Sequence, residues 1–201
     1  QTTALPKGEL AEPQTAIIDK QKPMVALTFD DGPHYTVTPR ILDILQEYNA
    51  RATFFVLGNR VDNFPNIIQR EYSQGHEIGS HSFSHPQITT LTSEEIEYQF
   101  AETEHRIQQY VPYTTNLVRP PYGQITQSLK EVLQKTFVLC SIDTQDWKTR
   151  DKDAIVSEVL NNVKDGDIIL MHDMYSTTAD ACEELIPALI ERGYQLVTVS
   201  E

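Results

Sequence analysis

Residues 24–33 read MVALTFDDGP, a nearly continuous apolar run that ends abruptly in two aspartates and a Gly-Pro pair. A short apolar run of this kind predicts a strand over residues 24–29 that is buried on both faces of a sheet. Gly32-Pro33 is typical of a sharp turn, so we expect the chain to leave the strand there. Asp30 and Asp31 would then lie at the carboxyl end of a buried strand.

The pattern of a short apolar run followed by polar residues recurs along the chain. The further predicted strands are residues 53–57, 77–79, 117–119, 137–141, 168–171 and 195–199. Amphipathic segments lie between them, with helix starts predicted at Thr38-Pro39 and at the capping box 92–95. Alternating strands and helices indicate a parallel sheet with right-handed crossovers. The predicted fold class is therefore α/β, either a small, irregular (β/α) barrel or an open doubly wound sheet.

Length and charge limit the class of protein. The chain has 201 residues, which fits one domain, and we expect a tail or linker over residues 1–22 followed by a domain over residues 23–201. It carries 29 acidic and 16 basic residues, a formal charge of −13. Nucleic acid and anionic lipid are thus not expected as the main partner, because both bind clustered Lys and Arg. No run approaches the ~18–20 apolar residues of a membrane span.

Polar clusters follow five of the seven predicted strands. They are residues 30–33, 80–85, 119–123, 143–147 and 172–173. In barrels and in open α/β sheets, functional residues gather at the carboxyl ends of parallel strands. These clusters are therefore expected to converge on one mouth.

Two histidines in the second cluster suggest a metal site. His81 and His85 are four residues apart, which would bring both imidazoles to one face of a helical turn with about 6 Å between Cβ atoms. Asp31, at another strand end, can supply a third ligand. Two histidines and one carboxylate leave positions open for water and substrate, as catalytic zinc sites do.

The adjacent aspartates invite a glycosidase interpretation, which their spacing disfavours. Neighbouring residues in an extended chain point to opposite sides, whereas glycosidase carboxylates flank the sugar from ~5 Å or more apart. A division of labour fits better. One aspartate would bind the metal, and its neighbour would act on a water molecule at the metal.

Five segments resemble, in order, the motifs of the polysaccharide deacetylase family, which is carbohydrate esterase family 4 or the NodB homology domain. They are Thr28-Phe29-Asp30-Asp31-Gly32-Pro33, His81-Ser82-Phe83-Ser84-His85, Arg119-Pro120-Pro121-Tyr122-Gly123, Asp143-Thr144-Gln145-Asp146-Trp147 and Leu170-Met171-His172. The resemblance runs from about Met24 to Val199. It implies a distorted (β/α) barrel with about seven parallel strands, and a hydrolase that removes N-acetyl groups from a sugar polymer with one divalent metal ion.

The resemblance also implies roles for individual residues. Asp31, His81 and His85 would bind the metal, which we expect to be zinc, with cobalt or nickel as alternatives. Asp30 would be the general base. Arg119 would pair with Asp30 and keep it ionised, since a neighbouring cation lowers the pKa of a carboxylate.

Further roles follow from the last three motifs. His172 would be the general acid that protonates the departing amine, and Asp143 would orient and charge it. The backbone N–H of Tyr122 would help to stabilise the oxyanion beside the substrate. Leu170 and Trp147 would form the apolar pocket for the acetyl methyl group.

Alternatives remain open for class and substrate. Two histidines and a carboxylate also serve non-haem iron oxygenases, but these have no use for the separate acid and base that His172 and Asp30 would provide. A non-catalytic sugar-binding module would be expected to have lost one of the two. Peptidoglycan N-acetylglucosamine is the first expected substrate, and a chitooligosaccharide deacetylase or an acetylxylan O-esterase would use the same site. We expect a monomer, secreted or associated with a bacterial cell wall.

Overall fold

The computed structural model describes residues 5–6 and 9–201. Strand β1 (Met24–Asp30) lies at the centre of a parallel sheet, and every residue after its first is buried. On one side it pairs with β7 (Asp167–His172) from Val25 to Asp30. On the other side, β8 (Gln195–Val197) pairs with the first half of β1 and β2 (Thr53–Val56) with the second half.

The sheet curls because one short segment, residues 138–141, hydrogen-bonds to strands at both of its ends. Beyond β2 it continues through β3 (Glu77–Ser80), β4 (Leu117–Val118) and β5 (Thr136–Phe137), and beyond β7 it ends at β6 (Ile142–Asp143). Next to β5, Val138 donates its N–H to Val118 at 2.9 Å, and next to β6, Ser141 donates its N–H to Ile168 at 2.9 Å. The chain from β5 to β6 therefore bridges the two edges and closes a distorted barrel.

This architecture confirms the predicted fold of about seven parallel strands, with one predicted strand divided in two. The described residues form eight strands, all paired in parallel. The single strand expected over residues 137–141 breaks in two, since its start pairs with β4 and the residues after it pair with β7. A segment that changes neighbours cannot keep one continuous ladder of hydrogen bonds.

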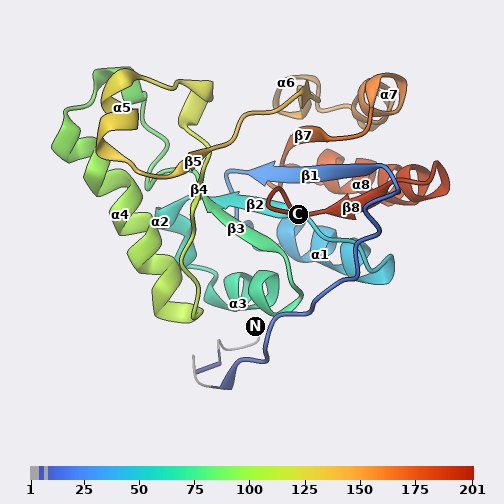
Figure 1. Cartoon of the computed structure of the whole chain (residues 1–201), viewed down its shortest axis with the longest axis horizontal. Coiled ribbons are helices and arrows are strands. Elements are labelled where there is room, and N and C mark those ends of the chain that lie inside the picture. The colour runs from blue at the N-terminus through green and yellow to red at the C-terminus, as the bar shows by residue number, and fades with distance from the viewer. Residues whose placement is uncertain (1–4, 7–8) are drawn as a thin grey trace.

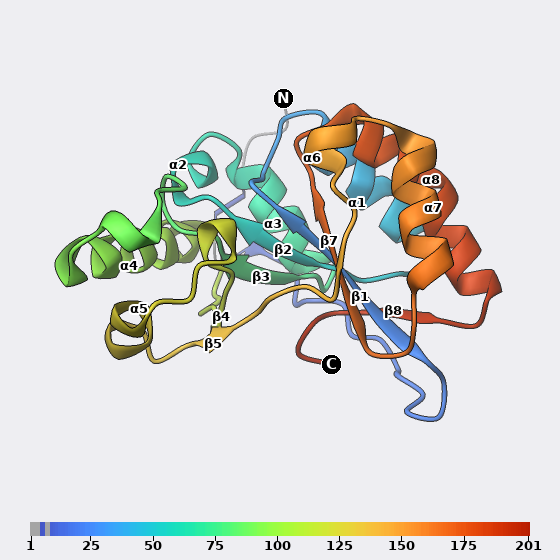
Figure 2. The same cartoon turned by 90° about the horizontal axis from the view of Figure 1, so that it is seen from above.

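Helices cover the outer face of the curled sheet, with α1, α7 and α8 on one side and α4 and α5 on the other (Figures 1 and 2). Their bounds are α1 (Val37–Glu47), α2 (Gly58–Val61), α3 (Pro65–Ser73), α4 (Ser93–Tyr110), α5 (Gln127–Val132), α6 (Asp146–Thr149), α7 (Lys152–Asn162) and α8 (Ser176–Glu191), with 3₁₀ turns η2 (Ile88–Thr90) and η3 (Pro121–Gly123). The predicted capping box is present, with reciprocal hydrogen bonds between Thr92 and Glu95. Helix α1 begins one residue before Thr38, so this threonine lies inside the first turn instead of capping it.

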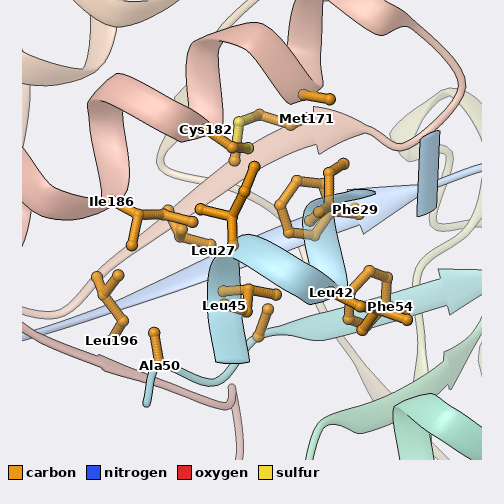
Figure 3. Packing of buried hydrophobic residues seen from close by; sticks show 14 of the residues in the cluster. Leu27, Phe29, Leu42, Leu45, Ala50, Phe54, Met171, Cys182, Ile186 and Leu196 are labelled. Atoms are coloured by element: carbon orange, nitrogen blue, oxygen red, sulfur yellow. The ribbon is translucent and has the colours of Figure 1, made fainter. Parts of the chain in front are cut away.

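The main hydrophobic core lies between the sheet and the outer helices. Leu27 and Phe29 of β1 are fully buried against Leu42 of α1 and Ile186 of α8 (Figure 3). Successive side chains of a strand point to opposite faces. Thr28 and Asp30, which alternate with them, therefore point into the barrel, toward its mouth.

The segment before β1 runs along the domain. Leu10 packs against the main core, Gln14 donates its N–H to Ser73 at 3.1 Å, and Asp19 donates its N–H to the side chain of Gln195 at 2.8 Å. Of the helices in the described residues, none combines the length and apolar character needed to cross a membrane.

Candidate metal and catalytic site

The register of the strands brings the predicted site residues to one edge of the sheet. Asp30 of β1 lies directly beside His172 of β7. Ser80, which precedes His81, lies beside Val118, which precedes Arg119. Because all these strands run in parallel, the residues that follow them meet at the same end of the barrel.

Three of the predicted side chains form a cluster that fits one metal ion. The Nε2 atoms of His81 and His85 lie 3.6 and 3.7 Å from Oδ1 of Asp31. One ligand atom from each residue lies within 4.8 Å of the others. Oδ1 of Asp31 is buried and accepts no hydrogen bond from the described residues, although burying an unpaired carboxylate oxygen is costly. The donor set suits a divalent ion such as zinc.

A backbone carbonyl fixes the state of His81. Its Nδ1 lies 2.6 Å from the carbonyl oxygen of Arg119, which can only accept a hydrogen bond. Nδ1 must therefore carry the proton, and the lone pair of Nε2 faces the cluster. Burial lowers the pKa of His85, which favours the neutral imidazole that a metal requires.

The loop that carries both histidines is not the helical turn expected from their spacing. Ser82 and His85 have left-handed backbone conformations, with φ of 72° and 58°. Hydrogen bonds fix the loop: the N–H groups of Phe83 and Ser84 both donate to the side chain of Gln99, and His85 donates its N–H to Ser82. The imidazoles are brought together by these turns rather than by helical periodicity.

Asp30 lies beneath the cluster in a buried ion pair. Nη1 of Arg119 donates to its Oδ1 at 2.8 Å, and the same nitrogen donates to the hydroxyl of Thr28 at 2.7 Å. The guanidinium carbon lies 4.2 Å from the ring centre of Phe55 inside the barrel. Oδ2 of Asp30 lies 3.7 Å from Nε2 of His81. The structure thus joins Asp30 and Arg119 as predicted and leaves one carboxylate oxygen directed toward the cluster.

The partner of His172 differs from the prediction. Nδ1 of His172 lies 2.7 Å from Oδ1 of Asp146, the first residue of α6. Asp143 is exposed instead, and its carboxylate accepts the N–H of Gln145 at 2.9 Å. Gln145 has a left-handed conformation with φ of 51°, which turns the chain so that the third residue after Asp143 faces the histidine. Asp146 therefore takes the role that we expected for Asp143.

The aromatic residues of the motifs line the mouth. Tyr122 is 67% exposed and Trp147 is 49% exposed, so both can be reached by a ligand. The ring of Tyr122 lies 4.7 Å from that of His85 in an edge-on contact. Leu170 lies two residues before His172 on β7 and therefore on the same face of the sheet. A methyl pocket formed by Leu170 and Trp147 stays a prediction.

Sequence reasoning missed one buried acid near the site. The hydroxyl of Thr38 donates to the carboxylate of Asp173 and accepts the N–H of His34 at 2.7 Å. A Cβ atom at Gly32 would lie 2.2 to 2.6 Å from atoms of the Asp173 carboxyl group, so this carboxyl group packs flat against the turn after Asp31. Its position directly after His172 was the available signal.

Comparisons with known proteins agree with this geometry. A family model described as polysaccharide deacetylase matches residues 18–138. The peptidoglycan-N-acetylmuramic acid deacetylase PdaC of Bacillus subtilis is 44% identical over 98% of the chain. Its solved structure superposes with a TM-score of 0.89 at 45% identity and covers 91% of both chains. The peptidoglycan-N-acetylglucosamine deacetylase PgdA of Listeria monocytogenes is 40% identical over 90% of the chain.

A third relative extends the comparison to another sugar polymer. The structure of a family 4 acetyl xylan esterase from Clostridium thermocellum, in complex with a cobalt ion, has a TM-score of 0.84 at 38% identity and covers 88% of both chains. The chain spans 42% of the length of PdaC and 39% of that of PgdA.

Proposed function

Because the chain belongs to the polysaccharide deacetylase family, we propose that it is a metal-dependent hydrolase that removes N-acetyl groups from a sugar polymer. One observation carries the proposal. Asp30 and His172 lie beside each other on β1 and β7, next to the cluster of Asp31, His81 and His85. A base, an acid and an open three-ligand site at one mouth are the parts that amide hydrolysis requires.

A divalent ion held by the cluster would supply a Lewis acid for the acetyl carbonyl and for water. Asp30 takes a proton from the water that attacks the carbonyl carbon, and Arg119 holds the Asp30 carboxylate in place through a hydrogen bond of 2.8 Å. As the carbon–nitrogen bond breaks, His172 gives its proton to the departing amine. The products are acetate and a free amino sugar. Tyr122, Trp147 and Leu170 line the place where the acetyl group is bound.

Peptidoglycan is the proposed substrate, since the two relatives above are named as peptidoglycan deacetylases. The protein then acts at the bacterial cell wall, as a secreted monomer that uses zinc. A chitooligosaccharide or acetylxylan is the second candidate, and the esterase relative is the observation that favours the latter.

The test measures acetate released from peptidoglycan, chitin oligomers and acetylxylan under identical conditions, with zinc added and oxygen excluded. Dialysis against a chelator should abolish release, and zinc or cobalt should restore it. Asp31→Ala is the matched control that removes a ligand from the cluster. Full activity in a metal-free sample would contradict the mechanism, and a strict need for oxygen and iron would favour an oxygenase.

A further inference from the structure

Two helices hydrogen-bond to the backbone of the histidine loop, residues 81–85. The first two residues of α2 donate their N–H groups to the carbonyl oxygens of Ser82 and Phe83, at 3.1 and 3.0 Å. Helix α4 supplies the acceptor for the N–H groups of Phe83 and Ser84, and this acceptor is the side chain of Gln99. Every residue except proline has a backbone N–H. Of these two contacts, the one from α4 therefore depends on which side chain the sequence provides.

The amide of Gln99 uses both of its ends on the loop. Its Oε1 accepts the N–H groups of Phe83 and Ser84, each at 2.9 Å. Because a backbone N–H can only donate, the atom that both groups approach must be the oxygen, which fixes the orientation of the amide. Its Nε2 then donates to the hydroxyl of Ser84 at 3.1 Å. One side chain thus binds two consecutive residues of the loop and pairs the N–H group of each.

Helix α4 gives Gln99 a fixed position. Ile96 and Phe100, which precede and follow Gln99 on the helix, are buried in a second hydrophobic cluster. Tyr98 contacts the loop directly, since its ring lies 5.8 Å from that of Phe83 in an edge-on arrangement. A functional site is held more precisely by a helix than by another loop. Gln99 therefore couples the histidine loop to the packing of α4.

The loop needs such support because its backbone conformation is unfavourable by itself. Ser82 and His85 are left-handed, a conformation that residues other than glycine, asparagine and aspartate rarely adopt. Such conformations persist only where the surrounding structure holds them. Phe83 and Ser84 lie between these two residues, so Gln99 binds the segment that separates the two turns. If this segment were released, the imidazole of His85 would lose its position in the cluster.

We infer that Gln99 is a positioning residue for the metal site: it holds the histidine loop in its metal-binding conformation and thereby sets the affinity of the cluster for the ion. The inference rests on the proposed function, which takes Asp31, His81 and His85 as the metal ligands. It goes further because Gln99 lies outside the five motifs and acts through the backbone of the loop. Groups that orient metal ligands in this way typically change metal affinity by ~10- to 100-fold.

The experiment measures the affinity of the metal-free protein for zinc, by competition with a chromophoric chelator. Gln99→Leu is similar in size and favours a helix, but it accepts no N–H group, so it should bind zinc ~10- to 100-fold more weakly than wild type. Gln99→Glu keeps an oxygen at the same reach and adds a negative charge, so it should bind zinc at least as tightly as wild type. Gln99→Asn is one methylene shorter and should behave like Gln99→Leu.

Gln109→Leu is the matched control, because Gln109 is exposed on the same helix and its amide contacts His105 of that helix. Its zinc affinity should equal that of wild type. An affinity unchanged in Gln99→Leu, an equal loss in Gln109→Leu, or a Gln99→Glu variant as weak as Gln99→Leu would overturn the inference.

Two further measurements separate this role from a structural one and from the proposed reaction. Urea unfolding of the metal-free variants reports their stability, and a purely structural role would lower the free energy of unfolding of Gln99→Leu while leaving its zinc affinity unchanged. Acetate release is assayed separately. Zinc affinities in the expected order without acetate release would contradict the proposed function and support this inference.

Discussion

Asp146 holds His172 through both of its carboxylate oxygens: Oδ1 lies 2.7 Å from the ring Nδ1, and Oδ2 accepts the backbone N–H of His172 at 2.7 Å. The carboxylate also accepts hydrogen bonds from the hydroxyl of Thr178 and the N–H of Trp147. The side chain is fully buried, and its hydrogen bonds hold it in one orientation. The imidazole is therefore oriented and charged by one fixed group.

The first prediction concerns the pH dependence of the rate. Burial lowers the pKa of His172, but the hydrogen bond and charge of Asp146, with the charges of Asp30 and Asp31, outweigh it and raise the pKa to about 9. A general acid works while protonated, so His172 sets the alkaline limb of kcat/KM. Asp146→Asn removes the negative charge and should move this limb to lower pH.

Asp143→Asn is the control for this profile. Asp143 is exposed and contacts the N–H of Gln145, so its neutralisation should leave the alkaline limb in place. Both variants should be assayed with the same buffers and metal loading. A limb that moves with Asp143 and not with Asp146 would reverse our assignment.

The second prediction concerns the contribution of the His172–Asp146 pair to the free energy of unfolding of the metal-free protein. The pKa of His172 in the folded state lies above its ordinary value of ~6.5, so its protonation stabilises the fold. This contribution is fully present below pH ~6.5 and is lost as the pH rises through about 9. Urea unfolding at several pH values should therefore show that Asp146→Asn destabilises most at pH 6, with a smaller deficit at pH 10.

The third prediction separates the base from the metal ligands. Asp30→Asn should lower kcat by ~10²- to 10⁴-fold, the usual contribution of a general base. Metal content, measured by elemental analysis, should stay at wild type, because Asp31, His81 and His85 are unchanged. Asp31→Asn should lose metal in the same assay. Since Oδ2 of Asp30 lies only 3.7 Å from Nε2 of His81, loss of metal from Asp30→Asn would make Asp30 a ligand.

The fourth prediction tests the close packing behind the metal loop. A Cβ atom at Gly32 would overlap the carboxyl group of Asp173, so Gly32→Ala should displace the turn that carries Asp31. Overpacking of this kind costs typically ~1–3 kcal/mol. We expect a lower free energy of unfolding and at least tenfold weaker metal binding, measured by titration calorimetry.

Gly166→Ala provides the comparison. Its φ of +84° makes alanine strained, yet a Cβ atom there meets no other atom within 4 Å. This variant should lose stability from backbone strain alone, ~1–2 kcal/mol, and bind metal as wild type does. Equal metal affinities in the two variants would show that the contact with Asp173 does not position Asp31.

The sequence allowed the fold to be predicted where burial alone decides it. The apolar run that ends in Asp30 predicts a strand buried on both faces, and β1 is such a strand. The run over residues 137–141 also indicates a buried segment, but burial does not specify a neighbour. Residues near its start pair with β4 and those after it pair with β7, which only the closure of the barrel determines.

For the site as well, the sequence predicted which residues take part but not the backbone conformation that brings them together. The spacing of His81 and His85 correctly predicted that they lie together, although left-handed residues at Ser82 and His85 bring this about instead of a helix. The choice between Asp143 and Asp146 depends on the conformation of Gln145, and single-sequence patterns do not reveal such a turn. The residue types at the site could be predicted, whereas the left-handed turns that orient these side chains could not.

Arg119 binds one partner through its backbone and another through its side chain. Its carbonyl oxygen holds the ring of His81, and its guanidinium holds Asp30. Every amino acid has that carbonyl, so point mutation at position 119 changes the support of the base while the support of the metal ligand is retained. Replacing Arg119 by a neutral residue would therefore leave Asp30 buried without its partner, at a cost of ~3–5 kcal/mol, although the carbonyl that holds His81 remains.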